Sequence, residues 1–175
     1  MQNETLMLYK LIILYILDSV DYPLTNTRLT DFIVERNYTN YFNVQQVLAQ
    51  LVEDGYVSSE VTRNTTTYLI TTSGGQALSL FLNDLNPAIR KDIDNYLKDH
   101  SYALREEVSY PADYEITNSG DYMTRLTIME RNQPIFELRM SVPNEDDAIR
   151  VCNEWERSNM DLYRYAVMKL IGGGH

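Results

Sequence analysis

The chain has 175 residues, of which 44% are hydrophobic, and it carries a formal net charge of −10. A chain of this length can bury a core and has room for two small domains, whereas its single cysteine excludes a disulfide framework and favours a reducing, cytoplasmic location. The negative charge opposes nucleic-acid binding, because Lys and Arg side chains supply much of the affinity for phosphates.

Three helices are predicted in the N-terminal third of the chain. Residues 5–20 are apolar on nearly every side, which is typical of an enclosed helix. This stretch contains Lys10 and its apolar run is too short to cross a bilayer, so we expect no membrane association. Pro23 ends the helix, and Thr25 begins a run of capping residues before a short amphipathic helix. A polar turn at 38–41 then leads into a third helix, whose apolar residues recur at helical spacing.

After the third helix the sequence changes to a β pattern. Gly55 is expected to cap that helix in a left-handed conformation. The runs 56–61 and 67–71 have the length and the β-branched content of a two-stranded hairpin. Two further helices are expected, one over residues 75–83 capped by Ser73 and one from Pro87 to at least His100.

Beyond Pro111, polar and apolar residues alternate as in β-strands with one buried face. Residues 118–121 and 131–134 supply turn residues between the strands. We therefore predict a three-stranded antiparallel meander over 114–117, 122–129 and 135–142, followed by two helices with separate apolar stripes. The predicted fold class is α+β, with one domain over residues 1–100 and a small antiparallel-sheet-plus-helices domain over 111–171.

Three helices followed by a hairpin, with a polar turn before the third helix, is the element order of a winged helix-turn-helix. In that architecture the third helix enters the major groove, and the hairpin, called the wing, lies along the DNA backbone. Asn and Gln side chains can pair with adenine, and the outward face of the third helix is rich in these amides. The predicted DNA-binding residues are Thr39, Asn40, Tyr41, Asn43, Gln45, Gln46 and Gln50 of the turn and third helix, with Arg63 and Asn64 of the wing tip.

Charge argues against strong DNA binding. Residues 1–75 contain four basic side chains, Lys10, Arg28, Arg36 and Arg63, against eight acidic ones. No strong positive field therefore attracts DNA, and an exposed amide face is also common on helices that only contact solvent.

Several stretches resemble a known family, namely residues 8–17, 23–25, 38–42, 47–51 and 68–71 with Gly74. Together they resemble a bacterial winged-helix family of unknown function and, more distantly, the PadR-like transcriptional regulators. The similarity continues through Ala148, Cys152 and Trp155 and so covers nearly the whole chain. The resemblance implies a winged-helix fold, a role in transcription and DNA contact through residues 40–53. Such relatives commonly place Lys or Arg on this helix or on the wing, and here the helix has neither.

The sequence shows no clear set of catalytic or metal-binding residues. The histidines, His100 and His175, have no nucleophile at a readable spacing. Cys152 stands on an apolar stripe beside Trp155, where a buried thiol is the simpler interpretation. Residues 73–75 lack the Lys and the glycine spacing of a phosphate loop. We therefore expect no enzymatic activity, no cofactor and no metal.

The leading hypothesis is a cytoplasmic, homodimeric transcriptional regulator that binds double-stranded DNA through the third helix. A dimer would present two recognition helices about one helical turn apart, and the first, fifth and C-terminal helices are candidates for its interface. The alternative is a winged-helix protein–protein interaction module that does not bind DNA, which the negative charge would explain. The C-terminal domain would dimerise or sense a signal, and the sequence identifies no effector.

Overall fold

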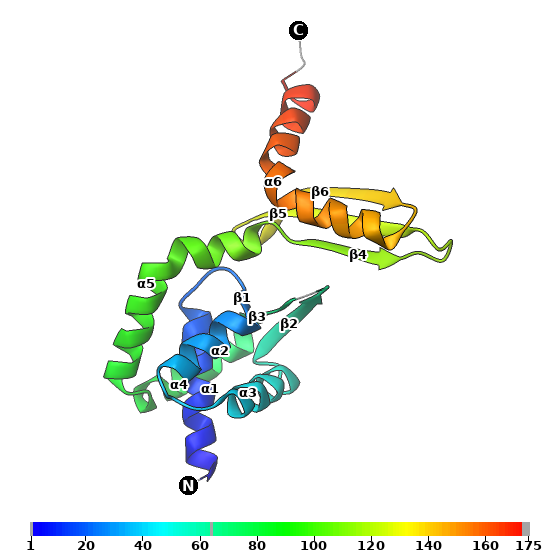
Figure 1. The fold of residues 1–175 in the computed structure, drawn as a ribbon. Coiled ribbons are helices and arrows are strands. Elements are labelled where there is room, and N and C mark those ends of the chain that lie inside the picture. The colour runs from blue at the N-terminus through cyan, green and yellow to red at the C-terminus, as the bar shows by residue number, and fades with distance from the viewer. Residues whose placement is uncertain (1, 64, 173–175) are drawn as a thin grey trace. The chain divides into compact units, whose positions relative to one another are not determined.

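The computed structural model describes residues 2–63 and 65–172. The chain divides into two compact units, residues 1–105 and 106–175. Its fold class is α+β, because the described residues form six α-helices and two three-stranded antiparallel sheets (Figure 1). The boundary between the units falls inside one long helix, α5 (Pro87–Ser109), which continues well beyond His100.

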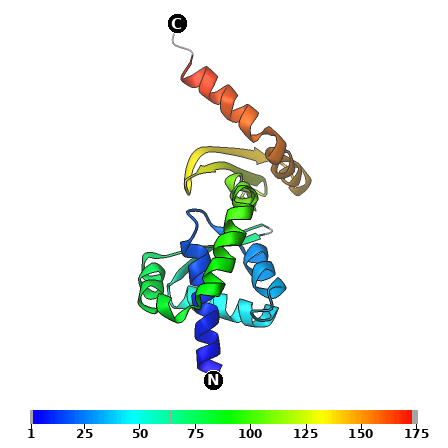
Figure 2. The same ribbon diagram turned by 90° about the vertical axis from the view of Figure 1, so that its left-hand side faces the viewer.

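The first unit is built around its N-terminal helix. In chain order its elements are α1 (Gln2–Asp18), β1 (Leu24–Thr25), α2 (Asn26–Glu35), α3 (Tyr41–Glu53), β2 (Val57–Thr62), β3 (Thr65–Ile70), α4 (Thr72–Phe81), the 3-10 turn η1 (Leu82–Asp84) and most of α5. Helix α1 runs through the middle of this unit, with helices on both sides of it (Figure 2). Six of its side chains are at most 3% exposed: Leu11, Ile12, Ile13, Leu14, Ile16 and Leu17. The apolar character of α1 is therefore explained by burial within its own unit.

The start of α2 and the end of α3 are capped by the residues that the sequence predicts. The hydroxyl of Thr25 accepts a hydrogen bond from the backbone N–H of Arg28 at 3.2 Å and caps the start of α2. At the end of α3, Gly55 has a φ of 75°, and the backbone N–H of Tyr56 donates to the carbonyl of Leu51 at 2.9 Å. This is the hydrogen-bond pattern of a Schellman motif, so the predicted glycine cap is confirmed.

The sheet of the first unit has the strand order β1-β3-β2 and is antiparallel. The predicted hairpin is confirmed as β2 and β3, with Val57 opposite Ile70. The strand β1 was not predicted; its Leu24 lies opposite Tyr68 and is 3% exposed. Two residues are too few to show alternation, and the preceding Pro23 indicated only the end of a helix.

Helix α4 begins earlier than residue 75, the predicted start. The hydroxyl of Thr71, and not that of Ser73, caps the helix by accepting a hydrogen bond from the backbone N–H of Gly74 at 3.1 Å. Gly74 is buried against the backbone of Tyr56, whose carbonyl oxygen would collide with an added Cβ. The sequence needs glycine here because the first turn of α4 closely approaches the start of the hairpin.

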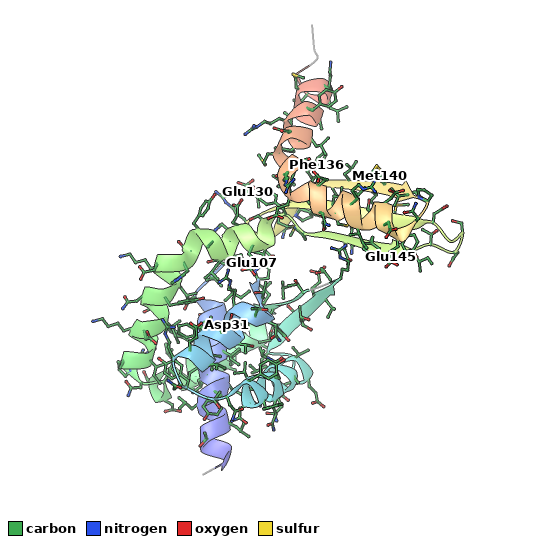
Figure 3. The ribbon with its side chains drawn as sticks, viewed as in Figure 1. Asp31, Glu107, Glu130, Phe136, Met140 and Glu145 are labelled. Carbon is green, nitrogen blue, oxygen red and sulfur yellow. The ribbon has the colours of Figure 1, made fainter. Side chains whose placement is uncertain are left out.

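The second unit is an antiparallel sheet covered on one face by a helix. Its elements after α5 are β4 (Ala112–Ile116), β5 (Tyr122–Glu130), β6 (Gln133–Val142) and α6 (Glu145–Leu170), and the strand order is β4-β5-β6. Residues Arg131 and Asn132 have φ values of 50° and 58°, as a two-residue type I′ turn requires. Trp155 of α6 is 2% exposed and stacks on Phe136 of β6, with 6.4 Å between ring centroids. Phe136 is labelled in Figure 3. The predicted antiparallel meander is confirmed.

The prediction of two C-terminal helices is wrong, because residues 145–170 form the single helix α6. The segment between the two apolar stripes contains no Pro or Gly that would break a helix. The side-chain amide of Asn159, a residue type that often ends helices, instead donates to the carbonyl of Trp155 at 2.9 Å, inside the helix. The buried residues of α6 end at Asn159, and the helix continues beyond the sheet from there (Figure 1).

Candidate functional site

The polar residues at the start of α3 form a local cap. The side-chain carbonyl of Asn40 accepts a hydrogen bond from the backbone N–H of Asn43 at 3.0 Å. The side-chain amide of Asn43 donates to the hydroxyl of Thr39 at 2.8 Å. Three of the predicted DNA-binding residues are thus bonded to one another. Their first role is to fix where α3 begins.

Gln45 differs from the expectation that it lies on the outward face of α3. Its side chain is half-buried, and its amide nitrogen donates to the side-chain carbonyl of Asn26 at 3.1 Å and to the hydroxyl of Thr30 at 3.0 Å. Asn26 in turn donates to the side-chain carbonyl of Gln45 at 2.8 Å and to the hydroxyl of Tyr68 at 3.1 Å. This network ties α3 to α2 and to β3. Gln45 therefore positions the helix and is not free to meet a ligand.

The outward face of α3 is formed by the remaining residues on the side opposite its buried stripe. We call Tyr41, Phe42, Gln46, Ala49 and Gln50 the α3 outer face. Phe42 is 80% exposed and Tyr41 is 53% exposed. Their rings meet edge to face with 5.8 Å between centroids. Gln46 and Ala49 are exposed and Gln50 is half-buried, so this surface combines amides with apolar groups.

Phe42 was missing from the predicted site although the sequence contained the necessary signal. It lies two residues before the buried Val44, and two residues along an α-helix correspond to a rotation of about 200°. The periodicity that placed Val44 inward therefore placed Phe42 outward. A large aromatic residue at an exposed position is more informative than an exposed amide, because its burial by a partner is favourable.

The tip of the hairpin lies in the same unit as α3. Val61 of β2 is 74% exposed, Arg63 is half-buried, and the hydroxyl of Thr62 donates to the carbonyl of Thr65 across the turn at 3.2 Å. Asn64, the second predicted wing residue, lies outside the described residues. The described part of the tip therefore combines an exposed apolar side chain with one guanidinium group.

The turn between α2 and α3 is held by a polar cluster on α5. The Arg36 Nε atom lies 2.8 Å from a carboxylate oxygen of Asp92, and the hydroxyl of Tyr38 donates to the same oxygen at 2.6 Å. The guanidinium of Arg36 also lies over the ring of Phe32, 4.2 Å from its centroid. A second ring, Tyr96 of α5, lies 4.6 Å from Phe32, centroid to centroid. These contacts anchor the segment that leads into α3.

The same cluster changes the acidity of two groups. Partial burial opposes ionisation of Asp92, but hydrogen bonds from Tyr38 and Arg36 and the charge of Arg36 outweigh it and lower the pKa of Asp92. Burial, the hydrogen bond to Asp92 and the charge of Asp92 raise the pKa of Tyr38 to about 12. At neutral pH the Asp92 carboxylate is therefore charged and the Tyr38 phenol is neutral, which is the combination that the hydrogen bond needs.

The surroundings of α3 carry more negative than positive charge. The helix has no Lys or Arg, and it ends with Glu53 beside Asp54. Lys10 of α1 lies 3.1 Å from a carboxylate oxygen of Asp54, and Arg36 is paired with Asp92. These two cations are therefore neutralised by neighbouring carboxylates within the same unit.

The comparison with protein families matches residues 9–170, a range that includes both units. The family carries the description "Domain of unknown function (DUF4364)". The chain belongs to this family. Neither the comparison with curated proteins nor the comparison with solved structures found a match.

In this DUF4364 chain, the described helices include none that is long and apolar enough to span a membrane. The described residues also contain no group of three or more His, Cys, Asp and Glu side chains placed to hold a metal ion. Cys152 is 6% exposed and belongs to the core of the second unit. The Nδ1 atom of His100 lies 2.9 Å from the carbonyl of Tyr96, and His175 lies outside the described residues.

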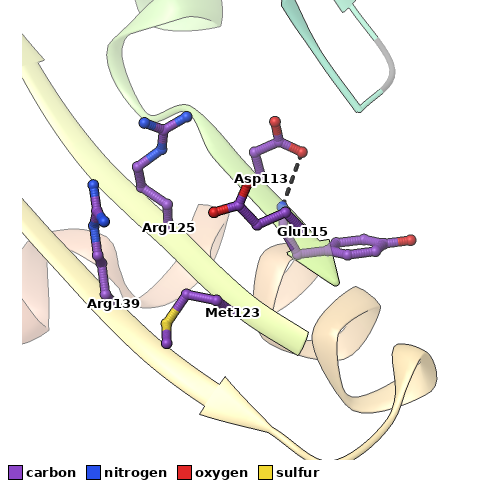
Figure 4. A pocket seen from close by; sticks show the side chains of 6 residues that line it. Asp113, Glu115, Met123, Arg125 and Arg139 are labelled. Carbon is purple, nitrogen blue, oxygen red and sulfur yellow. Dashed lines mark hydrogen bonds between the residues drawn. The ribbon is translucent and has the colours of Figure 1, made fainter. Parts of the chain in front are cut away.

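Two hollows in this family member are candidates for small ligands. One, on the outer face of the second sheet, is lined by Asp113, Tyr114, Glu115, Met123, Arg125 and Arg139 (Figure 4). Its volume of about 50 Å³ is far below the roughly 300 to 1,000 Å³ of typical ligand pockets. The other is a groove of about 520 Å³ between the end of α1 and α5.

Several polar groups of the larger groove are held by bonds within the first unit. A carboxylate oxygen of Asp21 lies 2.8 Å from a guanidinium nitrogen of Arg105. The Tyr15 hydroxyl donates to a carboxylate oxygen of Asp94 at 2.9 Å. The serine hydroxyls of this groove bond to backbone carbonyls, Ser19 to Tyr15 at 2.7 Å and Ser101 to Lys98 at 3.3 Å. The α3 outer face is therefore the better candidate for a functional site.

Proposed function

We propose that residues 1–105 form a winged helix-turn-helix that binds double-stranded DNA, and that the protein is a cytoplasmic transcriptional regulator distantly similar to PadR-like regulators. The element order supports this proposal, since α1, α2 and α3 are followed by the β2–β3 hairpin with β1 along its edge. In proteins of this architecture the third helix is the one that enters the major groove. The assigned role is one of binding and not of catalysis.

The exposure of the α3 outer face is the observation that carries the proposal. A helix with its side chains is roughly 10–12 Å across, which suits a major groove about 12 Å wide. Gln46 is exposed on this helix and Gln50 is half-buried one turn later, and glutamine can form two hydrogen bonds with the edge of adenine. The networks of Gln45 and of Asp92 hold the helix in a fixed orientation, which favours recognition because little order is lost on binding.

A second candidate function is supported by the composition of the same surface. Helix α3 has no basic residue, and its most exposed large side chain is the aromatic Phe42. Aromatic residues are enriched at the centres of protein–protein interfaces. A winged helix that binds another protein, and not DNA, would therefore also use Tyr41 and Phe42.

A DNA-shift assay separates the two functions. The purified protein is titrated into duplex DNA from the region upstream of its own coding sequence at low salt, because added salt weakens every contact between a basic side chain and a phosphate and this unit has few basic side chains. We expect saturable retardation. The double variant Gln46→Ala with Gln50→Ala should weaken it by about tenfold or more, because each good amide–base pair contributes roughly 1–3 kcal/mol.

The matched control is Gln76→Ala, which removes an exposed amide from α4 and should leave binding unchanged. Retardation that the double variant does not weaken would place the contact elsewhere on the molecule. No retardation at any salt concentration would reject DNA binding and favour the interaction module.

We further propose that the protein is a homodimer joined by the C-terminal part of α6. Beyond Asn159, where its buried residues end, α6 continues with further apolar side chains. The exposed ones in this part of the helix include Leu162, Tyr165, Met168 and Leu170. An apolar stripe of this kind is stabilised when a partner covers it.

A second, antiparallel copy of α6 suits this stripe by charge. Asp161 lies near the start of this part of the helix, where its carboxylate is 3.8 Å from the guanidinium of Arg164, and Lys169 lies near its end. Two antiparallel copies bring each aspartate towards the lysine of the other copy, whereas parallel copies bring like charges together. Light scattering should then report about twice the chain mass of 20.4 kDa, and a mass equal to one chain at all concentrations would reject the dimer.

A further inference from the structure

The α3 outer face contains a restricted set of chemical groups. Gln46 and Gln50 offer amides, while Phe42 and Ala49 offer apolar surface. The other amides of this region bond within the unit: Gln45 to Asn26 and Thr30, Asn43 to Thr39, and Asn40 to the backbone N–H of Asn43. Helix α3 therefore presents amide donors and acceptors and apolar groups, and it presents no cation.

Each base pair needs a different partner in the major groove. Guanine is most often read by Arg or Lys, which donate to its O6 and N7 atoms. Adenine is read by Asn or Gln, which bond its N6 and N7 atoms, and the C5-methyl group of thymine is read by apolar contact. The groups on the α3 outer face match adenine and thymine and lack the usual partners of guanine.

We propose, as a deepening of the DNA-binding role proposed above and resting on it, that α3 reads A·T base pairs, with Phe42 against a thymine methyl group and Gln46 on adenine. The two residues are one turn apart on the exposed side of the helix. A rise of 1.5 Å per residue separates them by about 6 Å along the helix axis, close to two base-pair steps of about 3.4 Å each. Adjacent or nearly adjacent A·T pairs can therefore meet both side chains.

Phe42 is assigned the contact with the thymine methyl group because its ring is exposed. With 80% of its surface exposed, it contributes little to the core of its own unit, so contact with DNA can bury most of the ring. The neighbouring Tyr41 ring meets it edge to face and limits the directions in which Phe42 can turn. The pair thus offers an apolar ridge at the N-terminal end of α3, the end nearest the base edges in this architecture.

The first experiment selects binding sites from a pool of random duplexes with the full-length protein. We expect the enriched sites to contain runs of A·T pairs. The second experiment replaces the thymines of an enriched duplex by uracils, which lack the C5-methyl group. Loss of one buried methyl contact should weaken binding by about fourfold.

The variant Phe42→Ala tests which residue makes this contact. It should bind the thymine duplex at least as weakly as the wild type binds the uracil duplex, because the whole ring is lost, and it should no longer distinguish the two. Leu80→Ala, which removes a side chain that is 78% exposed on α4, is the matched control and should retain the fourfold difference. Circular dichroism of both variants verifies that folding is unchanged.

The outcomes separate the two proposals. Saturable binding with guanine-rich selected sites, or with equal affinity for thymine and uracil duplexes, would overturn A·T reading while DNA binding stands. A thymine preference that persists in Phe42→Ala would overturn the assignment to Phe42. Selection of no duplex from the pool would reject DNA binding itself.

Discussion

Helix α1 and the last third of α6 have similarly apolar sequences but opposite environments. In α1, Ile13 has no exposed surface and its apolar neighbours are nearly as buried. In α6, Leu170 is 84% exposed and Met168 is 57% exposed. The difference arises because the other elements of the first unit surround α1, whereas the sheet of the second unit covers α6 only up to Asn159. Apolar content alone therefore does not distinguish a core helix from a helix whose apolar side chains are exposed.

The largest loss of folding stability is expected from shortening a buried side chain of α1. Ile13→Ala should lower the free energy of unfolding by about 2–5 kcal/mol, through lost burial and the cavity left in the core. Urea unfolding followed by far-UV circular dichroism measures the change. The fluorescence of Trp155, the single tryptophan, reports on the core of the second unit and should shift less. A loss below about 1 kcal/mol would contradict the assigned role of α1 as the centre of its core.

A smaller loss of folding stability is expected at Asp92, because polar contacts and not apolar burial hold α5 to the turn before α3 at this point. Asp92 is partly exposed, so its pair with Arg36 should contribute about 0–1 kcal/mol. The pKa of Asp92 is lower in the folded protein than its ordinary value of 3.8. Its contribution is therefore fully present above pH 3.8 and is lost as the pH falls through the lower folded pKa.

Asp92→Asn should consequently make the free energy of unfolding depend less on pH below pH 3.8, the ordinary pKa of this carboxyl group. Thermal unfolding at several pH values measures this slope. The same variant removes the charge that helps to raise the pKa of Tyr38 to about 12. The wild type gains stability from Tyr38 below its ordinary pKa of 10.0 and loses it as the pH rises towards 12. An acid slope identical to the wild type would contradict the coupling described for Asp92.

The smallest effect on the stability of the single chain is expected at the exposed end of α6. Leu170→Glu should change the free energy of unfolding of the monomer by less than about 0.5 kcal/mol, as surface substitutions usually do. It should nevertheless halve the mass seen by light scattering. Leu80→Glu on α4 alters a similarly exposed leucine and should leave the mass unchanged. A variant that keeps the dimer mass would place the interface elsewhere.

Local sequence signals predicted the elements that depend on neighbouring residues. The cap at Thr25, the glycine end of α3 and the β2–β3 hairpin follow from residue types within a few positions of one another. The buried stripe of α3 follows in the same way from its helical period. These features required no knowledge of distant contacts.

Features that depend on distant contacts were not predicted correctly. The strand β1 exists because it pairs with β3, more than 40 residues later. The amide of Gln45 is engaged by Asn26 and Thr30 of α2, which its own position on α3 does not show. The continuity of α6 is a different case, because the amide of Asn159 bonds locally to the carbonyl of Trp155 within the helix, although asparagine ends helices in other settings.

The most direct measurement of the central proposal is a disulfide cross-link between α3 and DNA. The variant Ala49→Cys places a thiol on the exposed face of α3, and the duplex is one that the selection enriches, with a thiol tether on a base in the major groove. Wild-type protein, whose Cys152 is buried, and Gln76→Cys on α4 are the controls. We expect cross-linking of Ala49→Cys alone, and cross-linking no greater than that of Gln76→Cys would contradict contact between α3 and DNA.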